Sequence, residues 1–156
     1  MQLVDLLSRS RVQGGLALPS KKRLLEHLAR LLAEDEDAEL VRLIFEGLVS
    51  REKMGSTGLG MGIAIPHGRI AADIQPVAAF VRLRDALAYD AADGEPVDLV
   101  LALIVPEHFT DQHLQLLAQV AEMFDQAPLL GQLRAAADDE ALYRLLAEWR
   151  PAKARA

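Results

Sequence analysis

Two stretches in the first third of the chain have the hydrophobic periodicity of amphipathic helices. In each, apolar residues recur every three or four positions and charged residues occupy the opposite face. The first stripe consists of Leu24, Leu25, Leu28, Leu31 and Leu32. The second consists of Leu40, Leu43, Ile44, Gly47 and Leu48.

We expect Ser20 to cap the first helix, with the basic run 21–23 and His27 at its surface. The second should follow the acidic run 34–37 and end near Arg51. The chain before the first helix has neither pattern and is expected to be irregular.

Glycine and proline interrupt the pattern in the middle of the chain. The segment 55–62 holds four glycines in eight positions, which is too many for a regular element and predicts a loop. The apolar residues 63–65 then predict a short strand. Pro66 cannot donate a hydrogen bond to a sheet and Gly68 permits a turn, so this strand is expected to stop there. These features predict His67 at a strand end.

Two longer apolar runs predict the main strands. They span residues 77–83 and 97–105, and the second is apolar almost throughout, which is typical of a central strand buried on both faces. Residues 89–96 between them are rich in Asp, Gly and Pro and predict turns. Pro106 is expected to close the second strand.

Three helices are predicted after that strand. The first begins at Thr110 or Asp111, either of which can cap a helix, and it places His113 in its first turn. Pro128 marks the start of a second helix, and the acidic pair 138–139 marks the start of a third.

Length and composition predict one globular domain. With 156 residues, 51% of them hydrophobic and 4% aromatic, the chain can form one core of aliphatic side chains, and its many Ala and Leu residues favour helix over strand. The net charge of −6 argues against nucleic acid as a partner. The absence of cysteine excludes disulfides, thiolate metal sites and a cysteine nucleophile.

The beginning of the chain shows no targeting signal. Asp5, Arg9 and Arg11 interrupt the apolar residues of the first twenty positions, which argues against a signal peptide. No stretch reaches the ~18 uncharged apolar residues that a membrane-spanning helix needs. We therefore expect a cytoplasmic protein without membrane insertion.

His67 and His113 are the residues best suited to carry chemistry. A neutral imidazole is a good nucleophile at neutral pH, and its second nitrogen can hold a proton for an orienting carbonyl. A phosphoryl group on it would carry about −1.5 to −2 charge and would need hydrogen-bond donors. Arg51, His113 and the loop amides around Gly62 could supply them. Positioning and charge are the main requirements of phosphoryl transfer, so neither a cofactor nor a metal is expected.

Each of these residues also has a purely structural interpretation. His67 could bond a nearby backbone group, His113 could be a partly exposed helix residue, and Arg51 could interact only with the helix dipole. The glycine spacing in 58–62 is not that of a dinucleotide-binding loop. A metal site that joined His108 to His113 would lack the His-Glu-x-x-His pattern of zinc enzymes.

The segment 51–68 resembles the signature of the type-2 enzyme IIA domains of the phosphotransferase system, the fructose and mannitol class. It reads Arg-Glu-Lys-Met-Gly-Ser-Thr-Gly-Leu-Gly-Met-Gly-Ile-Ala-Ile-Pro-His-Gly. In that family an arginine lies 16 positions before the phosphorylated histidine and a second histidine lies 46 positions after it, which matches Arg51, His67 and His113. The resemblance implies that an HPr-like phosphocarrier loads the Nε2 atom of His67, giving a tele-phosphohistidine that Arg51 and His113 stabilise.

The same resemblance implies a fold and a domain organisation. It implies an α/β fold with a mixed β-sheet flanked by α-helices. We expect residues 1–150 to form this single domain and residues 151–156 to be a frayed tail.

The outer parts of the chain resemble the nitrogen-regulatory branch of that family. The similarity covers Ser-Arg-Val at 10–12, Ser-Lys-Lys-Arg at 20–23, Pro-Val-Asp-Leu at 96–99 and Asp-Asp-Glu-Ala-Leu-Tyr at 138–143. At this length we expect no fused IIB domain, HPr-like domain or membrane IIC segment. The resemblance implies regulation by phosphorylation-dependent binding of protein targets such as potassium-transport or sensor-kinase systems.

Three other functions remain open on the sequence. The chain could be a fructose- or mannitol-specific enzyme IIA that passes its phosphoryl group to a IIB domain. It could be a module that regulates by binding alone, with His67 no longer phosphorylated. A metal-dependent hydrolase that uses the histidines is the remaining alternative.

Overall fold

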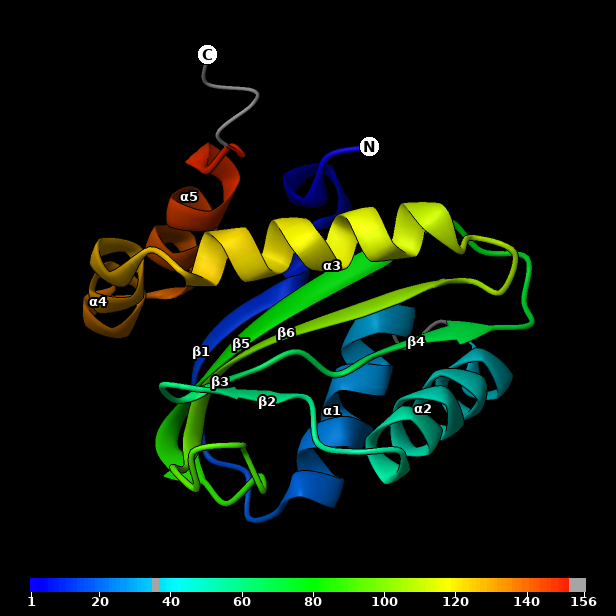
Figure 1. Cartoon of the computed structure of the whole chain (residues 1–156), viewed down its shortest axis with the longest axis horizontal. Coiled ribbons are helices and arrows are strands. Elements are labelled where there is room, and N and C mark those ends of the chain that lie inside the picture. The colour runs from blue at the N-terminus through cyan, green and yellow to red at the C-terminus, as the bar shows by residue number, and fades with distance from the viewer. Residues whose placement is uncertain (35–36, 152–156) are drawn as a thin grey trace.

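The computed structural model describes residues 1–34 and 37–151 (Figure 1). Its α-helices are α1 (Lys21–Ala33), α2 (Ala38–Lys53), α3 (Asp111–Phe124), α4 (Ala127–Ala135) and α5 (Asp139–Glu148). Its strands are β1 (Val12–Leu16), β2 (Gly58–Gly60), β3 (Ile63–Ala64), β4 (His67–Ile70), β5 (Val77–Leu87) and β6 (Val97–Pro106). Two short 3-10 helices, η1 (Leu3–Leu6) and η2 (Arg9–Arg11), precede β1. The α/β architecture predicted for the chain is confirmed.

The strands form one mixed sheet in the order β1-β5-β6-β3-β2, and β4 also pairs with β6. Strand β6 runs antiparallel to β5 and parallel to β3 and β4. It therefore lies in the middle of the sheet, as its apolar sequence predicts. Strands β3 and β4 lie end to end along one side of β6, so Ile63 faces Leu99 and His67 faces Leu103.

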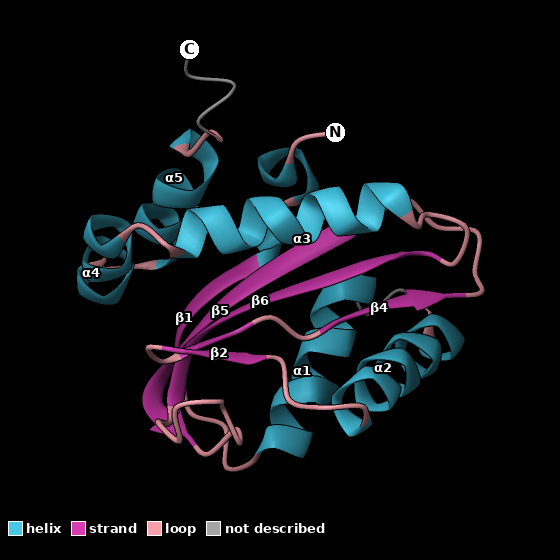
Figure 2. Cartoon of the chain, in the orientation of Figure 1, coloured by secondary structure: helices cyan, strands magenta, loops and turns pink. Residues whose placement is uncertain are grey.

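Helices cover both faces of the sheet (Figure 2). Alternate residues of β6 point into two separate cores because side chains of a strand alternate between its faces. Leu101 and Leu103 pack with α3, α4, α5 and η1, whereas Val100 and Ala102 pack with α1 and α2. All of β6 except Asp98 is buried, which explains its nearly continuous apolar sequence.

Helix boundaries follow the predicted caps with one exception. The Ser20 hydroxyl accepts a hydrogen bond from the Arg23 amide at 3.2 Å, and Asp138 accepts one from the Ala141 amide at 2.8 Å. At α3 the residue before the helix is Thr110, but its side chain makes no capping bond. The prediction that α3 is capped by a side chain is therefore wrong for Thr110.

Three strands form where the sequence did not predict them. The segment expected to be irregular before Ser20 contains β1, which gains its hydrogen bonds from β5, far away in sequence. The loop predicted at 55–62 contains β2, an antiparallel partner of β3. The third is β4, which begins at His67 itself. The strand predicted at 63–65 does stop before Pro66, but a second strand begins directly after this proline. Pro66 lacks an N–H group, but it is tolerated because it joins the sheet only through its carbonyl oxygen, which accepts a hydrogen bond from the Leu103 amide at 3.0 Å.

No helix in residues 1–34 and 37–151 combines the length and apolar character needed to cross a membrane. The tail expected to fray lies outside the described residues, except for Pro151.

Candidate functional site

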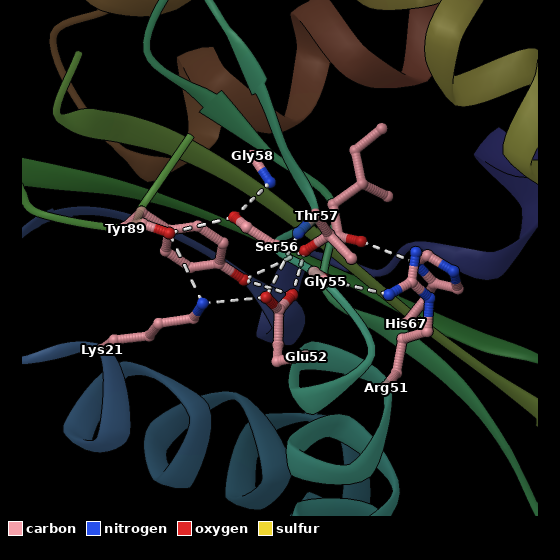
Figure 3. Close-up of polar contacts among 10 residues, drawn as sticks. Lys21, Arg51, Glu52, Gly55, Ser56, Thr57, Gly58, His67 and Tyr89 are labelled. Atoms are coloured by element: carbon pink, nitrogen blue, oxygen red, sulfur yellow. Dashed lines mark hydrogen bonds and ion pairs between the residues drawn. The ribbon is translucent and has the colours of Figure 1, made fainter. Parts of the chain in front are cut away.

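His67 is the first residue of β4, and its ring is held by the chain just before it. The Nδ1 atom lies 2.7 Å from the Ile65 carbonyl oxygen (Figure 3). A carbonyl can only accept a hydrogen bond, so Nδ1 carries the proton and Nε2 keeps its lone pair. Burial lowers the pKa of His67, the Arg51 charge lowers it further, and the bond to Ile65 and the charge of Glu52 oppose them. His67 is therefore a neutral imidazole with a nucleophilic Nε2 at neutral pH.

His113 lies beside it, in the first turn of α3. The centroids of the two imidazole rings are 5.3 Å apart, and the rings meet edge to face at 72°. The side chain is 8% exposed, so the interpretation as a partly exposed helix residue is wrong. Burial lowers the pKa of His113 to about 4, and the charges of His67 and Arg69 act in the same direction. Among the described residues, its buried Nε2 has no hydrogen-bond partner.

Arg51 reaches the same region from the last turn of α2. Its Nη1 donates a hydrogen bond to the Gly55 carbonyl at 2.8 Å, just beyond the end of the helix. The side chain is half-buried, and its positive charge is near enough to lower the pKa of His67. Arg51 thus has the structural role expected at a helix C-terminus, while its remaining N–H groups can still bind an anion.

An open cleft of about 890 Å³ joins the three side chains. Arg51 enters it from α2, His67 from β4 and His113 from α3. The cleft therefore places a nucleophilic nitrogen beside a guanidinium and a second imidazole. Two large apolar side chains at the cleft, Met54 and Leu114, are 82% and 67% exposed. Apolar side chains around a polar centre are typical of a site to which a protein partner binds.

The loop amides around Gly62 are not part of the cleft, so that prediction is wrong. Gly62 lies beside β6, where its carbonyl accepts bonds from the Asp98 and Leu99 amides. A Cβ atom there would come within 2.5 Å of the Arg134 guanidinium. In the described part of the chain, the glycines that line the cleft are Gly47 and Gly68 instead.

A buried cluster next to Arg51 was not predicted from the sequence. Its centre is the Glu52 carboxylate, which pairs with Lys21 Nζ at 2.9 Å and accepts hydrogen bonds from the Tyr89 hydroxyl at 2.8 Å and from Thr57 (Figure 3). Lys21 also lies 4.2 Å from the centroid of the Tyr89 ring, so it is not the solvated helix residue that was expected.

Charge and burial act together on this cluster, which comprises Lys21, Glu52, Thr57 and Tyr89. Burial alone would raise the pKa of Glu52, but the hydrogen bonds from Thr57, Lys21 and Tyr89 outweigh it and lower the pKa. Burial raises the pKa of the Tyr89 hydroxyl. The cluster therefore holds a carboxylate anion that accepts from neutral and cationic donors. A polar residue in a helix pattern gives no signal of such burial.

The other two histidines do not line the cleft. His108 is exposed and its ring contacts Phe109, with 4.8 Å between centroids. His27, expected at the surface, is half-buried, and its Nε2 lies 2.7 Å from the Gln13 amide oxygen. In the described part of the chain, no three His, Cys, Asp or Glu residues are arranged to hold a metal ion.

Comparison with known proteins relates the chain to one family. The family model described as "Phosphoenolpyruvate-dependent sugar phosphotransferase system, EIIA 2" matches residues 5–149. The nitrogen regulatory protein of Pseudomonas aeruginosa is 47% identical over 137 residues, 88% of this chain and 86% of that protein. The nitrogen regulatory protein of Escherichia coli is 41% identical over 149 residues, 95% of this chain and 91% of that protein.

Solved structures agree with that relation. The crystal structure of the nitrogen regulatory protein IIA-Ntr from Neisseria meningitidis has a TM-score of 0.83 and 39% identity, and the match covers 92% of this chain and 98% of that one. The mannitol IIA of Escherichia coli has a TM-score of 0.73 with 19% identity, covering 90% of this chain and 98% of that one, and therefore shares the fold.

Proposed function

Since this chain belongs to the type-2 EIIA family of the phosphoenolpyruvate-dependent sugar phosphotransferase system, we propose that it is a histidine phosphocarrier that accepts a phosphoryl group on Nε2 of His67. The donor is an HPr-like or nitrogen-branch phosphocarrier protein. One observation carries the proposal. His67 is neutral, with Nδ1 bonded to the Ile65 carbonyl and the lone pair of Nε2 available. Its ring centroid lies 5.3 Å from that of the buried His113, whose Nε2 has no hydrogen-bond partner among the described residues.

The geometry suits a direct transfer from a phosphorylated nitrogen of the donor protein to His67. The lone pair on Nε2 of His67 attacks phosphorus as the N–P bond on the donor breaks, and the donor nitrogen recovers its electron pair. The Nδ1 proton stays on His67, where the Ile65 carbonyl stabilises the positive charge that develops on the ring. Since the atoms balance without another reactant, the transfer is reversible and requires mainly alignment and charge.

The bound phosphoryl group needs positive and hydrogen-bonding neighbours. It carries about −1.5 to −2 charge and three acceptor oxygens. The guanidinium of Arg51 supplies charge. Nε2 of His113, protonated as the donor tautomer and without a partner among the described residues, supplies a hydrogen bond. A buried polar atom without a partner is costly, so the phosphorylated state satisfies His113 and contributes to its own stability.

We favour a regulatory role over sugar uptake for this phosphocarrier. The relatives named nitrogen regulatory protein reach 47% identity, while the fructose-specific EIIABC component of Bacillus subtilis is 27% identical and the match covers only 23% of that protein. Phosphorylation changes the charge of the cleft, so binding of regulatory targets at its apolar rim depends on the state of His67. Potassium-transport or sensor-kinase proteins are the targets that the sequence resemblance implies.

Intact mass spectrometry tests the phosphocarrier role. The protein is incubated with phosphoenolpyruvate, enzyme I and either HPr or a nitrogen-branch phosphocarrier. Wild type should gain one acid-labile phosphoryl group, about 80 Da, and so should the control His108→Ala, because His108 lies outside the cleft. His67→Ala should gain none. Phosphorylation of His67→Ala, or of no variant with either donor, would contradict the proposal.

The fate of the phosphoryl group separates regulation from sugar uptake. A sugar-specific enzyme IIA would lose its label rapidly to a fructose or mannitol IIB domain when the sugar is supplied. A regulatory phosphocarrier should keep the label under those conditions while its affinity for a target changes. Target affinity that is identical for phosphorylated wild type, unmodified wild type and His67→Ala would indicate regulation by binding alone.

Domain extent and location are proposed with the same function. We propose that residues 1–150 form the phosphocarrier domain and that the protein acts in the cytoplasm. A chain that ends at residue 150 should accept the phosphoryl group at the wild-type rate. A clear loss of rate on removal of 151–156 would show that these residues take part.

A further inference from the structure

Three hydrogen bonds connect the buried Glu52 carboxylate to the ring of His67. The Thr57 amide donates to Glu52 Oε2 at 3.2 Å, and the Ile65 amide donates to the Thr57 carbonyl at 3.1 Å. The Ile65 carbonyl then accepts from Nδ1 of His67 at 2.7 Å. Figure 3 shows the carboxylate at one end of this path and the imidazole at the other. The residue whose carbonyl orients His67 is thus connected, through Thr57, to a residue of α2.

The carboxylate end of the path is firmly fixed. The Glu52 side chain is 5% exposed and is bonded from three separate parts of the chain: Lys21 at the start of α1, Thr57 in the loop after α2, and Tyr89 after β5. Hydrogen bonds to an ionised acceptor are about twice as strong as those between neutral groups. Lys21 balances the negative charge, so a buried carboxylate is tolerated close to a site that must also accept an anion.

The same loop positions Arg51. Residues 55–57 begin one residue after the C-cap of α2. Gly55 accepts the bond from Arg51, and Thr57 is bonded to Glu52. Gly55 has a φ of 142°, a backbone conformation that other residues rarely adopt. Movement of this loop would therefore displace the guanidinium and the acceptor imidazole together.

We propose that Glu52 and Thr57 are positioning residues for phosphoryl transfer, which act through the loop 55–57 and Ile65 to hold His67 as the Nδ1–H tautomer with Nε2 directed into the cleft. This inference rests on the proposed function. Neither residue lines the cleft, so neither touches the phosphoryl group. Their loss should therefore slow the transfer step and leave the affinity for the donor protein nearly unchanged.

The test compares Glu52→Gln, Thr57→Val and the conservative Thr57→Ser. Glu52→Gln keeps the shape and removes the charge and one acceptor atom, whereas Thr57→Val removes only the hydroxyl. Geometric errors of about 1 Å cost roughly 100-fold in rate, so we expect kcat to fall roughly 10- to 100-fold in Glu52→Gln and roughly threefold or more in Thr57→Val. KM for the donor should change less than about twofold, and Thr57→Ser should transfer at close to the wild-type rate.

Nitrogen NMR of the imidazole rings in the unphosphorylated protein provides the second readout. Wild type and Thr57→Ser should show His67 as the Nδ1–H tautomer alone, while Glu52→Gln and Thr57→Val should show a measurable Nε2–H fraction. Arg82→Met is the matched control, because Arg82 makes two hydrogen bonds, at 2.9 Å to Leu133 and 2.7 Å to Ala136, on the other face of the sheet. It should lose stability without any change in tautomer or transfer rate.

The two hypotheses fail in different ways. If wild type accepts no phosphoryl group, the proposed function is wrong. The tautomer measurement then still decides whether Glu52 and Thr57 hold the His67 ring as the Nδ1–H tautomer. If Thr57→Val and Glu52→Gln keep a single Nδ1–H tautomer and the wild-type kcat, Glu52 and Thr57 are merely structural and the inference is overturned. Should Glu52→Gln fail to fold, the comparison of Thr57→Val with Thr57→Ser still gives the answer. Both variants keep the amide and carbonyl of residue 57, and only Thr57→Val loses the hydroxyl bond that fixes the Glu52 carboxylate.

Discussion

Replacement of Gly68 by alanine tests how closely α2 must approach β4. Gly68 lies in β4 next to His67, and a Cβ atom there would be 3.2 Å from the Gly47 carbonyl oxygen and 3.3 Å from its carbon. Ordinary contacts of this kind are 3.4–4 Å. The obstacle is backbone, so helix α2 would have to move away by a few tenths of an ångström.

Two opposing effects set the size of the stability change. Alanine reduces the conformational freedom of the unfolded chain, which stabilises the protein by about 0.4–1 kcal/mol. Overpacking costs about 1–3 kcal/mol in a close-packed interior. We expect the cost to dominate, so Gly68→Ala should lower the free energy of unfolding by about 1 kcal/mol. Arg51 is carried on α2, so its displacement should slow phosphoryl transfer roughly two- to fivefold.

The control for this variant is Gly131→Ala. Gly131 lies in α4, and a Cβ atom there would meet nothing within 4 Å. Alanine in an open helical position should raise the free energy of unfolding by about 0.5–1 kcal/mol and leave transfer unchanged. Urea denaturation and single-turnover transfer measure both quantities. A Gly68→Ala protein that is stabilised as much as Gly131→Ala, with a wild-type transfer rate, would refute the argument.

Three other variants give sharp expectations. His113 has a folded pKa of about 4, below its unfolded value of about 6.5, so the unfolded chain binds more protons between these values. The free energy of unfolding should therefore fall as the pH drops through this range, and His113 contributes at most about 3 kcal/mol of this fall. Urea titrations at pH 7 and pH 4.5 should show a smaller fall for His113→Gln than for wild type. Arg69→Gln should raise the pKa of His113, because the Arg69 charge lowers it, and an NMR titration that shows no rise would contradict this. Asp138→Ala removes the cap of α5, so denaturation should show a loss of about 1 kcal/mol while phosphoryl transfer is unchanged.

The elements with strong periodicity were predictable, and those defined by distant pairing were not. The stripes of α1 and the apolar run of β6 each specify their own burial, so their type and place follow from the sequence. Strand β1 has the sequence Val-Gln-Gly-Gly-Leu, with only two apolar residues, and exists because it pairs with β5. Proline indicated a break before β4 correctly, but it could not indicate that the strand resumes one residue later.

The residues of the site also fall into a group that the sequence predicts and a group that only the fold brings together. Arg51 and His67 stand out through the family signature and His113 through its spacing from them, and the structure brings all three to one cleft. Glu52 and Thr57 lie within that signature as ordinary polar residues, and only the fold brings Lys21 and Tyr89 to them. Local sequence carries no record of a carboxylate that is bonded by two residues as far away in the chain as Lys21 and Tyr89.

The outer strands of the sheet have a consequence for self-association. Exposed strand edges invite pairing with other chains and hence aggregation. Strand β1 has five residues and an irregular register beside its two glycines, and β2 has three residues, with Gly60 at a φ of 95°. Such short, kinked edges present few aligned N–H and C=O groups to a second molecule. The glycines that make these strands hard to recognise in the sequence therefore also disfavour edge-to-edge aggregation of the folded protein.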